Sequence, residues 1–256
     1  MIDLVRRIKP LILCITNDVV KTDTANGLLA LGASPIMSNE KKELKDIIQH
    51  AGGVLLNIGT ASEEKIELYK KAAQYANEYK VPLVLDPVGY GASSFRKNLV
   101  DQLLESYEFS LVKGNASEML ALSGQMSQSK GVDSVETEKT SDIAKLVFQQ
   151  LKVPVLVTGE IDSYVDHEEQ LIMKNGHFYQ ATITGSGCIL GSFCAAFLAV
   201  DQSYEAVVKA TSLYNIAAEK AAHLSGGPSQ FRSQLIDEIY NFKENDFERK
   251  AVETFE

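Results

Sequence analysis

Short apolar runs alternate with longer segments of helical periodicity along most of this chain. The runs typical of buried strands lie at 10–15, 34–37, 54–58, 81–85, 109–112 and 153–157. Between them, residues 62–79 begin with Ser62 as a candidate N-cap, followed by Glu63 and Glu64 in the first turn. Because apolar strands separated by helices are buried on both faces, the pattern predicts an α/β protein with a mostly parallel central sheet and helices on both faces.

The second half of the chain is predicted to be mainly helical. Three helical patterns follow one another, at 189–200, 204–224 and 231–242. The first is almost wholly apolar, which indicates a buried helix. Asn175-Gly176, between apolar runs at 171–173 and 178–179, predicts a tight hairpin that adds an antiparallel edge to the sheet.

The chain is long enough for one domain with a large core. It has 256 residues, of which 45% are hydrophobic, and we predict a single domain over residues 1–242. Residues 125–139 are polar and lack periodicity, which predicts a mobile surface loop. Residues 243–256 are rich in charge and predict a solvated or frayed C-terminal tail.

Charge and cysteine content narrow the class of partner. A formal net charge of -9 argues against nucleic acid or an anionic membrane, so a small-molecule ligand is favoured. Cys14, Cys188 and Cys194 are odd in number and lack C-x-x-C spacing, which indicates neither a disulfide framework nor a zinc site. No apolar stretch reaches transmembrane length and no cleavage site follows the first apolar run, so we expect a protein of the reducing cytoplasm.

The run Gly185-Ser186-Gly187-Cys188 comes directly before the apolar helix. Two glycines let backbone N–H groups approach a ligand, and the free N–H groups and positive end of a helix favour a phosphate. A thiol at such a position can have a lowered pKa. The alternative interpretation is a tight turn followed by a small buried cysteine.

Polar residues follow three of the predicted strands. They are Asp86, Lys113 and Thr158, with Glu118 one turn into the helix after Lys113. Ligands of an open parallel sheet bind beyond the carboxyl ends of the strands, and carboxylates with a cation and a hydroxyl suit metal-assisted phosphoryl transfer. Each residue also has a simpler interpretation: Asp86 as a cap, Lys113 as a surface charge and Thr158 as a turn residue.

The standard nucleotide fingerprints are absent. Gly27 and Gly32 have the spacing of a P-loop, but no lysine follows them. Gly185, Gly187 and Gly191 have one residue too many for a dinucleotide fingerprint and come late in the chain. A hydride-transfer enzyme is therefore disfavoured.

A series of longer motifs is more specific. Thr16-Asn17 is followed by TANGLLALGASPIM at 24–37. Further motifs are DPVG at 86–89, KGNASE at 113–118, VTGE at 157–160, GSGC at 185–188 and GPSQF at 227–231. Together they resemble the hydroxyethylthiazole kinase family, a branch of the ribokinase-like superfamily, and the resemblance covers roughly residues 12–242.

The resemblance implies a fold, a reaction and an assembly. The fold would be a ribokinase-like three-layer sandwich. The reaction would be ATP-dependent phosphorylation of the primary alcohol of 5-(2-hydroxyethyl)-4-methylthiazole, in thiamine biosynthesis and salvage. Met37 and Gly185 would contact the thiazole. Members of the family are typically homotrimers with active sites where subunits meet.

The resemblance also implies how ATP is held. Lys113 and Thr158 would contact ATP, while Asp86 and Glu118 would support Mg²⁺, largely through waters. Lys113 stands where the family often has arginine, so its contact with a phosphate would be that of a point charge.

The catalytic base is left open. Related kinases place an aspartate after Gly-x-Gly, whereas this chain, like hydroxyethylthiazole kinases, has Cys188. With Gly185, Ser186 and Gly187, it forms the predicted catalytic group. Phosphoryl transfer passes through a loose transition state with little bond formation to the alcohol, so a strong base is not essential. Two rival hypotheses are a nucleotide-binding protein without turnover and a nucleotide-dependent lyase that repairs hydrated nicotinamide cofactors. Such a lyase should keep the aspartate.

Overall fold

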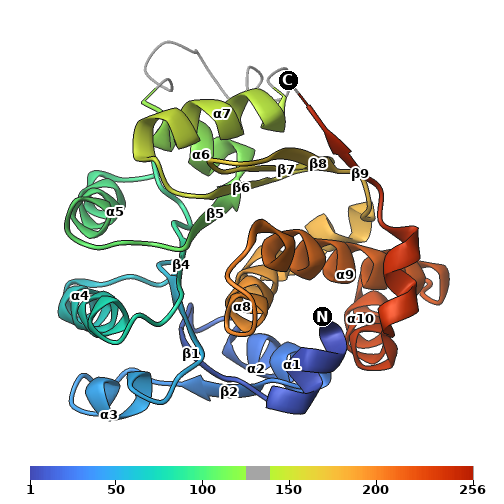
Figure 1. The fold of residues 1–256 in the computed structure, drawn as a ribbon, viewed down its shortest axis with the longest axis horizontal. Helices are drawn as coiled ribbons and strands as arrows, with labels where there is room; N and C mark the ends of the chain where they lie inside the picture. The colour runs from blue at the N-terminus through green and yellow to red at the C-terminus, as the bar shows by residue number, and fades with distance from the viewer. Residues whose placement is uncertain (125–138, 256) are drawn as a thin grey trace.

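A computed structural model describes residues 1–124 and 139–255, and these residues form one nine-stranded sheet in the order β2-β1-β3-β4-β5-β6-β7-β8-β9 (Figure 1). The strands are β1 (Leu11–Ile15), β2 (Ser34–Met37), β3 (Gly53–Asn57), β4 (Leu83–Asp86), β5 (Leu111–Asn115), β6 (Val155–Thr158), β7 (Asp162–Val165), β8 (Gln170–Met173) and β9 (Val252–Thr254). The pairs from β2 to β6 are parallel, and those from β6 to β9 are antiparallel.

Helices cover both faces of the sheet (Figure 1). On one face lie α3 (Leu44–Ile48), α4 (Glu63–Glu78), α5 (Ser94–Ser106), α6 (Ala116–Leu122) and α7 (Thr140–Leu151). On the other lie α1 (Ile2–Ile8), α2 (Lys21–Leu31), α8 (Ser186–Leu198), α9 (Tyr204–His223) and α10 (Pro228–Asn241). The three layers confirm the predicted α/β sandwich.

The burial of the parallel strands explains why they read as continuous apolar runs. All five residues of β3 are buried, with Val54 and Leu56 packed on the α3–α7 side and Leu55 packed on the opposite side. A strand covered on both faces has no solvent-facing positions to keep polar.

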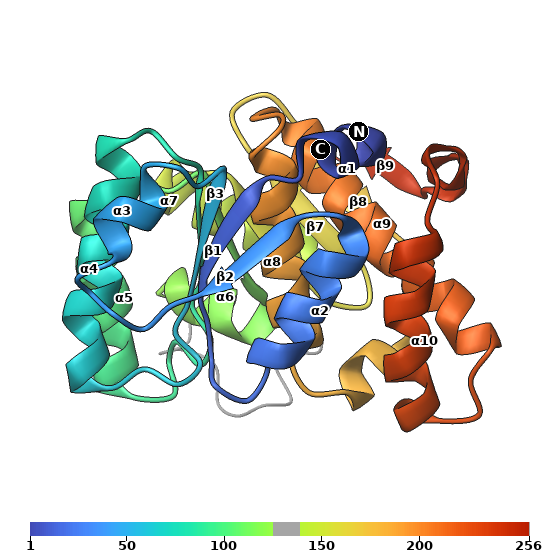
Figure 2. The same ribbon diagram turned by 90° about the horizontal axis from the view of Figure 1, so that it is seen from below.

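Helix α8 is the predicted apolar helix, and it lies against the sheet with α9 packed on its outer side (Figures 1 and 2). All but one of its residues are buried. None of the helices in residues 1–124 and 139–255 combines the length and apolar composition needed to cross a bilayer.

The predicted hairpin at Asn175-Gly176 is wrong. The residues that follow form a 3₁₀ helix, η3 (Phe178–Thr182), and β8 pairs instead with β7 and β9. The side chain of Asn175 donates hydrogen bonds to Glu219 and to the carbonyl oxygen of Arg249, while the Tyr179 ring packs 5.5 Å from that of Phe231. These tertiary contacts turn the chain away from a second strand. The predicted antiparallel edge is still present, built from β7, β8 and β9.

The expectation of a frayed tail after Phe242 is also wrong. Residues Glu244–Arg249 form a 3₁₀ helix, η4, and β9 extends the sheet. Phe247 is buried with its ring 5.0 Å from that of Phe242, and Glu244 accepts a hydrogen bond of 2.7 Å from the amino group of Met1. These contacts hold a segment whose charge pattern alone suggests solvation. The predicted loop at 125–139 lies outside the described residues except for Lys139.

Candidate active site

The candidate site is a cavity of about 1060 Å³ at the carboxyl ends of the parallel strands. It brings together eight of the nine residues that sequence analysis predicts for the site. These are Asp86, Lys113, Glu118, Thr158, Gly185, Ser186, Gly187 and Cys188. Parallel strands end at one edge of the sheet, so residues distant in the chain meet there.

The strand ends differ from the prediction in one respect. Asp86 and Thr158 are the last residues of β4 and β6, and Lys113 lies inside β5 instead of after it. The Lys113 side chain is only 3% exposed. It is therefore a buried charge, and the surface interpretation is wrong.

The first turn of α8 forms one wall of the cavity. Gly185 is the N-cap residue with φ of 82°, and a Cβ atom at this position would overlap the side chain of Val20. No side chain in the described part of the chain caps this helix end, so the N–H groups of Ser186, Gly187 and Cys188 have no partner within the helix. The hydroxyls of Ser186 and Tyr214 lie 2.9 Å apart and share a hydrogen bond.

Lys113 connects this helix end to the sheet. Its Nζ atom donates a hydrogen bond of 2.9 Å to the carbonyl oxygen of Gly187 and lies 3.8 Å from Oδ2 of Asp86. A Cβ atom at position 187 would lie 2.9 Å from this Nζ, so a side chain there would displace the ammonium group. Burial alone would lower the pKa of Lys113, but Asp86 and the neighbouring acidic groups raise it overall, so the lysine is charged.

Asp86 is a buried carboxylate with two nearby polar partners. The side chain of Asn57 donates a hydrogen bond of 2.7 Å to its Oδ2 atom. Burial raises the pKa of Asp86 to about 6, against the opposing effect of Lys113. Sequence analysis missed Asn57, although a polar residue inside the apolar run at 54–58 was a usable signal.

Glu118 ties together the segments that follow β4 and β5. Its two carboxylate oxygens each accept a hydrogen bond of 2.9 Å, from the backbone N–H groups of Gly89 and Asn115. The Asn115 side chain in turn accepts from the N–H of Glu118, which completes a capping box. Residues 1–124 and 139–255 contain no group of three His, Cys, Asp or Glu residues able to enclose a metal ion.

Cys188 lies at the junction of these elements. Its Sγ atom accepts a hydrogen bond of 3.3 Å from the side-chain amide of Asn17. Burial raises the pKa of Cys188 to about 11, with Asp86 adding to the shift and Lys113 opposing it. Sequence alone left the protonation state of this thiol open, because a helix N-terminus lowers the pKa of a thiol and burial raises it. The side chain is a neutral thiol at pH 7.

Two further residues concern the expected substrates. Thr158 donates a hydrogen bond of 3.3 Å to the carbonyl oxygen of Gly114. Met37, the ninth predicted residue, does not line the cavity. It ends β2 and pairs with Cys14 of β1, so β1 and β3 separate it from β4. Its role in contacting substrate stays a prediction.

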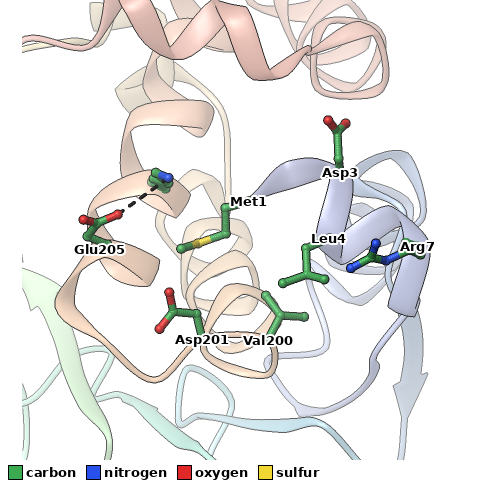
Figure 3. Close-up of a pocket in the computed structure, with 8 residues that line it drawn as sticks. Met1, Asp3, Leu4, Arg7, Val200, Asp201 and Glu205 are labelled. Carbon is green, nitrogen blue, oxygen red and sulfur yellow. Dashed lines mark ion pairs between the residues drawn. The ribbon is translucent and has the colours of Figure 1, made fainter.

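A second hollow lies at the opposite, C-terminal end of α8 (Figure 3). Its lining includes Met1, Arg7, Val200 and Glu205, and Glu205 forms an ion pair of 3.6 Å with Lys209 one helical turn away. None of the predicted site residues reaches it. We therefore place the candidate active site in the larger cavity alone.

Comparison with known proteins agrees with the motifs in that cavity. The sequence profile of the hydroxyethylthiazole kinase family matches residues 2–245. The chain belongs to the hydroxyethylthiazole kinase family. A hydroxyethylthiazole kinase from Macrococcus caseolyticus is 40% identical over 250 residues, covering 96% of this chain and 95% of that protein.

Solved structures extend the comparison to the fold of this family member. A hydroxyethylthiazole kinase protein from Pyrococcus horikoshii OT3 superposes with a TM-score of 0.91 at 35% identity, covering 100% of this chain and 97% of the other. A ribokinase-like superfamily protein from Enterococcus faecalis gives a TM-score of 0.66 at 13% identity, covering 94% of each chain. The second likeness shows the fold alone, which is ribokinase-like.

Proposed function

We propose that this hydroxyethylthiazole kinase family member transfers the γ-phosphoryl group of ATP to the primary alcohol of 5-(2-hydroxyethyl)-4-methylthiazole, in thiamine biosynthesis and salvage. One observation carries the proposal beyond family membership. A buried lysine, two carboxylates and an uncapped helix N-terminus line the same cavity at the end of a parallel sheet. Phosphoryl transfer requires this combination of positioning and charge stabilisation.

The phosphates would lie over the first turn of α8. The N–H groups of Ser186, Gly187 and Cys188 can donate to phosphate oxygens, and the positive end of the helix favours their charge. Lys113 adds a full positive charge beside this turn. Thr158, at the end of the neighbouring strand β6, also lines the cavity and would contact ATP.

The residues present fit a magnesium ion that arrives with ATP. Asp86 and Glu118 both line the cavity, and each oxygen of Glu118 that accepts one backbone hydrogen bond retains a second lone pair. Two carboxylates without a third ligand suit Mg²⁺, which keeps several waters and binds substrate phosphates. When bound, the ion would neutralise charge on the phosphates. Asp86 and Glu118 would orient its waters.

Cys188 would contribute as a neutral group. Its pKa, raised by burial to about 11, disfavours a thiolate base at pH 7, and its hydrogen bond from Asn17 would hold the sulfur beside the turn proposed to bind phosphate. A loose transition state forms little bond to the attacking alcohol, so early removal of the alcohol proton is not required. The N–H groups of α8 would then supply most of the stabilisation of the developing charge.

We further propose that the enzyme is a cytoplasmic homotrimer whose thiazole sites lie where subunits meet. The family pattern assigns Met37 and Gly185 to the thiazole, yet only Gly185 lines the cavity of a single chain. Completion of the site by a neighbouring subunit would account for this separation. The three cysteines are free and buried, which agrees with a reducing compartment.

A coupled assay of ADP release tests the function. With ATP, Mg²⁺ and the thiazole alcohol, we expect turnover, and with hydroxymethylpyrimidine as acceptor we expect a lower kcat/KM. ATP binding without turnover on the thiazole would support the rival hypothesis of a nucleotide-binding protein. A higher kcat/KM for the pyrimidine would contradict the substrate assignment.

A further inference from the structure

Asp162, the first residue of β7, is a second buried carboxylate in the wall of the cavity, and sequence analysis did not identify it. Both of its oxygens accept hydrogen bonds. The backbone N–H of Gly159 donates to Oδ1 at 3.0 Å, and the side chain of Asn215 donates to Oδ2 at 2.7 Å. Gly159 directly follows Thr158, so Asp162 holds the turn that carries one expected ATP contact.

Asn215 continues this hydrogen-bond series along the lining of the cavity. Its Oδ1 atom accepts a hydrogen bond of 3.0 Å from the side-chain nitrogen of Gln180. Gln180 in turn accepts one of 2.9 Å from the backbone N–H of His177. Each link has a defined donor, and the series ends on the acceptor-only carboxylate of Asp162.

The neighbour of Asn215 on α9 reaches the other side of the site. Tyr214 shares a hydrogen bond with Ser186, in the first turn of α8. Two adjacent residues of one helix are therefore connected to both segments proposed to bind ATP: Tyr214 directly to the helix end at Ser186, and Asn215 through Asp162 to the turn at Gly159. Tyr214 is 1% exposed and Asn215 3%, so water does not compete with either contact.

Burying a carboxylate at this position costs free energy that an apolar side chain of similar size would not. Burial raises the pKa of Asp162 to about 6, although the hydrogen bonds from Asn215 and Gly159 oppose this shift. Buried charges are expensive unless their hydrogen bonds are satisfied, and here two donors satisfy both oxygens.

We propose that Asp162 and Asn215 form a positioning pair that fixes the Thr158-Gly159 turn for ATP. The inference rests on the proposed function, because it assigns this turn to the nucleotide. Asp162 and Asn215 act through the backbone they hold and are not catalytic residues. The pair should therefore govern affinity for ATP more than affinity for the thiazole alcohol.

The polarity of the hydrogen-bond series makes the pair testable by exchange. Asp162→Asn leaves an amide nitrogen that faces either the amide nitrogen of Asn215 or the backbone N–H of Gly159, and neither can accept its hydrogen bond. Rotating the Asn215 amide would move the mismatch to Gln180, because its nitrogen already points at Asn215. Asn215→Asp sets two carboxylates against each other.

The double variant Asp162→Asn/Asn215→Asp satisfies every link again. The carboxylate introduced at position 215 would accept from Gln180 and from the new amide at position 162, whose oxygen would accept from Gly159. The control is Tyr164→Phe, on the same strand as Asp162. It removes the hydrogen bond of 2.8 Å that Tyr164 donates to Asp166, and Tyr164 does not line the cavity.

The experiment measures ATP binding without acceptor, KM for ATP and for the thiazole alcohol, kcat and thermal unfolding for all variants. We expect each single variant to weaken ATP binding about tenfold, the factor equivalent to about 1.4 kcal/mol. KM for the thiazole alcohol should change by less than about twofold. The double variant should regain most of the ATP affinity, and the control should keep it. If a single variant does not fold, the folded double variant decides the test.

Three results would overturn the positioning pair. The first is unchanged ATP affinity in folded single variants. The second is a folded double variant whose ATP affinity stays low. The third is an equal loss of affinity for ATP and for the thiazole alcohol that follows the folded fraction of the protein. A wild-type protein that binds no ATP would instead overturn the proposed function. The two failures are therefore distinct.

Discussion

The ammonium group of Lys113 donates a hydrogen bond of 2.9 Å to the carbonyl oxygen of Gly187, and so connects β5 to the first turn of α8. The same group lies 3.8 Å from Asp86 at the end of β4. One buried cation thus connects a carboxylate to the helix end that we propose binds phosphate. Its role in the site is structural as well as electrostatic, and the two can be separated by substitution.

Replacing Lys113 with methionine should remove both functions. The Asp86 carboxylate would lose its buried counter-charge, so the free energy of unfolding should fall by about 3 kcal/mol. We expect kcat/KM for ATP to fall at least about a hundredfold, since the phosphates lose a full charge. Lys113→Arg keeps the charge and is the matched control. Urea unfolding and steady-state kinetics provide the measurements. Equal activity of the methionine and arginine variants would contradict a role for Lys113 in phosphate binding.

Substitutions at Cys188 should distinguish a neutral neighbour from a base. Cys188→Ser should keep measurable turnover, because the N–H donors of α8 remain and a general base is typically worth about 10²–10⁴-fold. Cys188→Asp should have a kcat at or above that of the unmodified protein, because it adds a carboxylate to which Asn17 can still donate. An inactive but folded aspartate variant beside an active serine variant would show that repulsion of the γ-phosphate dominates. Steady-state kcat is the readout.

Glu118→Gln should separate magnesium support from helix capping. Glutamine can replace glutamate in a capping box, so its carbonyl oxygen can still accept from the N–H of Asn115 and keep α6 capped. Its amide nitrogen cannot accept from the N–H of Gly89, so Tm should fall slightly. Loss of the charge should lower kcat and weaken the dependence of rate on Mg²⁺. Titration of activity with Mg²⁺ tests this. A titration curve identical to that of the wild type would exclude Glu118 from the metal site.

Met37→Ala should affect the acceptor without affecting ATP. Methionine suits contact with a flat heteroaromatic ring, and its loss should raise KM for the thiazole alcohol about tenfold. KM for ATP should stay within about twofold, because Met37 does not line the cavity with Lys113 and Thr158. Sedimentation of the variant and the wild type controls for assembly. A change in KM for ATP alone would contradict the assignment.

The apolar pattern predicted the sheet and the position of most of the candidate site. Strands that are buried on both faces must be apolar throughout, as in β3, and this makes them visible in the sequence. Because parallel strands end at one edge, the residues at the ends of β4 and β6 could be placed together without coordinates. The long motifs shared with hydroxyethylthiazole kinases then indicated the chemistry.

Only the tertiary structure decided how those residues are partnered. Asp162 meets Asn215 across 53 positions of sequence, and Asn57 reaches Asp86 through strand register, which no local pattern encodes. Burial raises the pKa of the Cys188 thiol, an effect that its place at a helix end does not reveal. Local pattern determines which face of an element is buried, whereas burial depth and hydrogen-bond partners depend on elements brought together by folding.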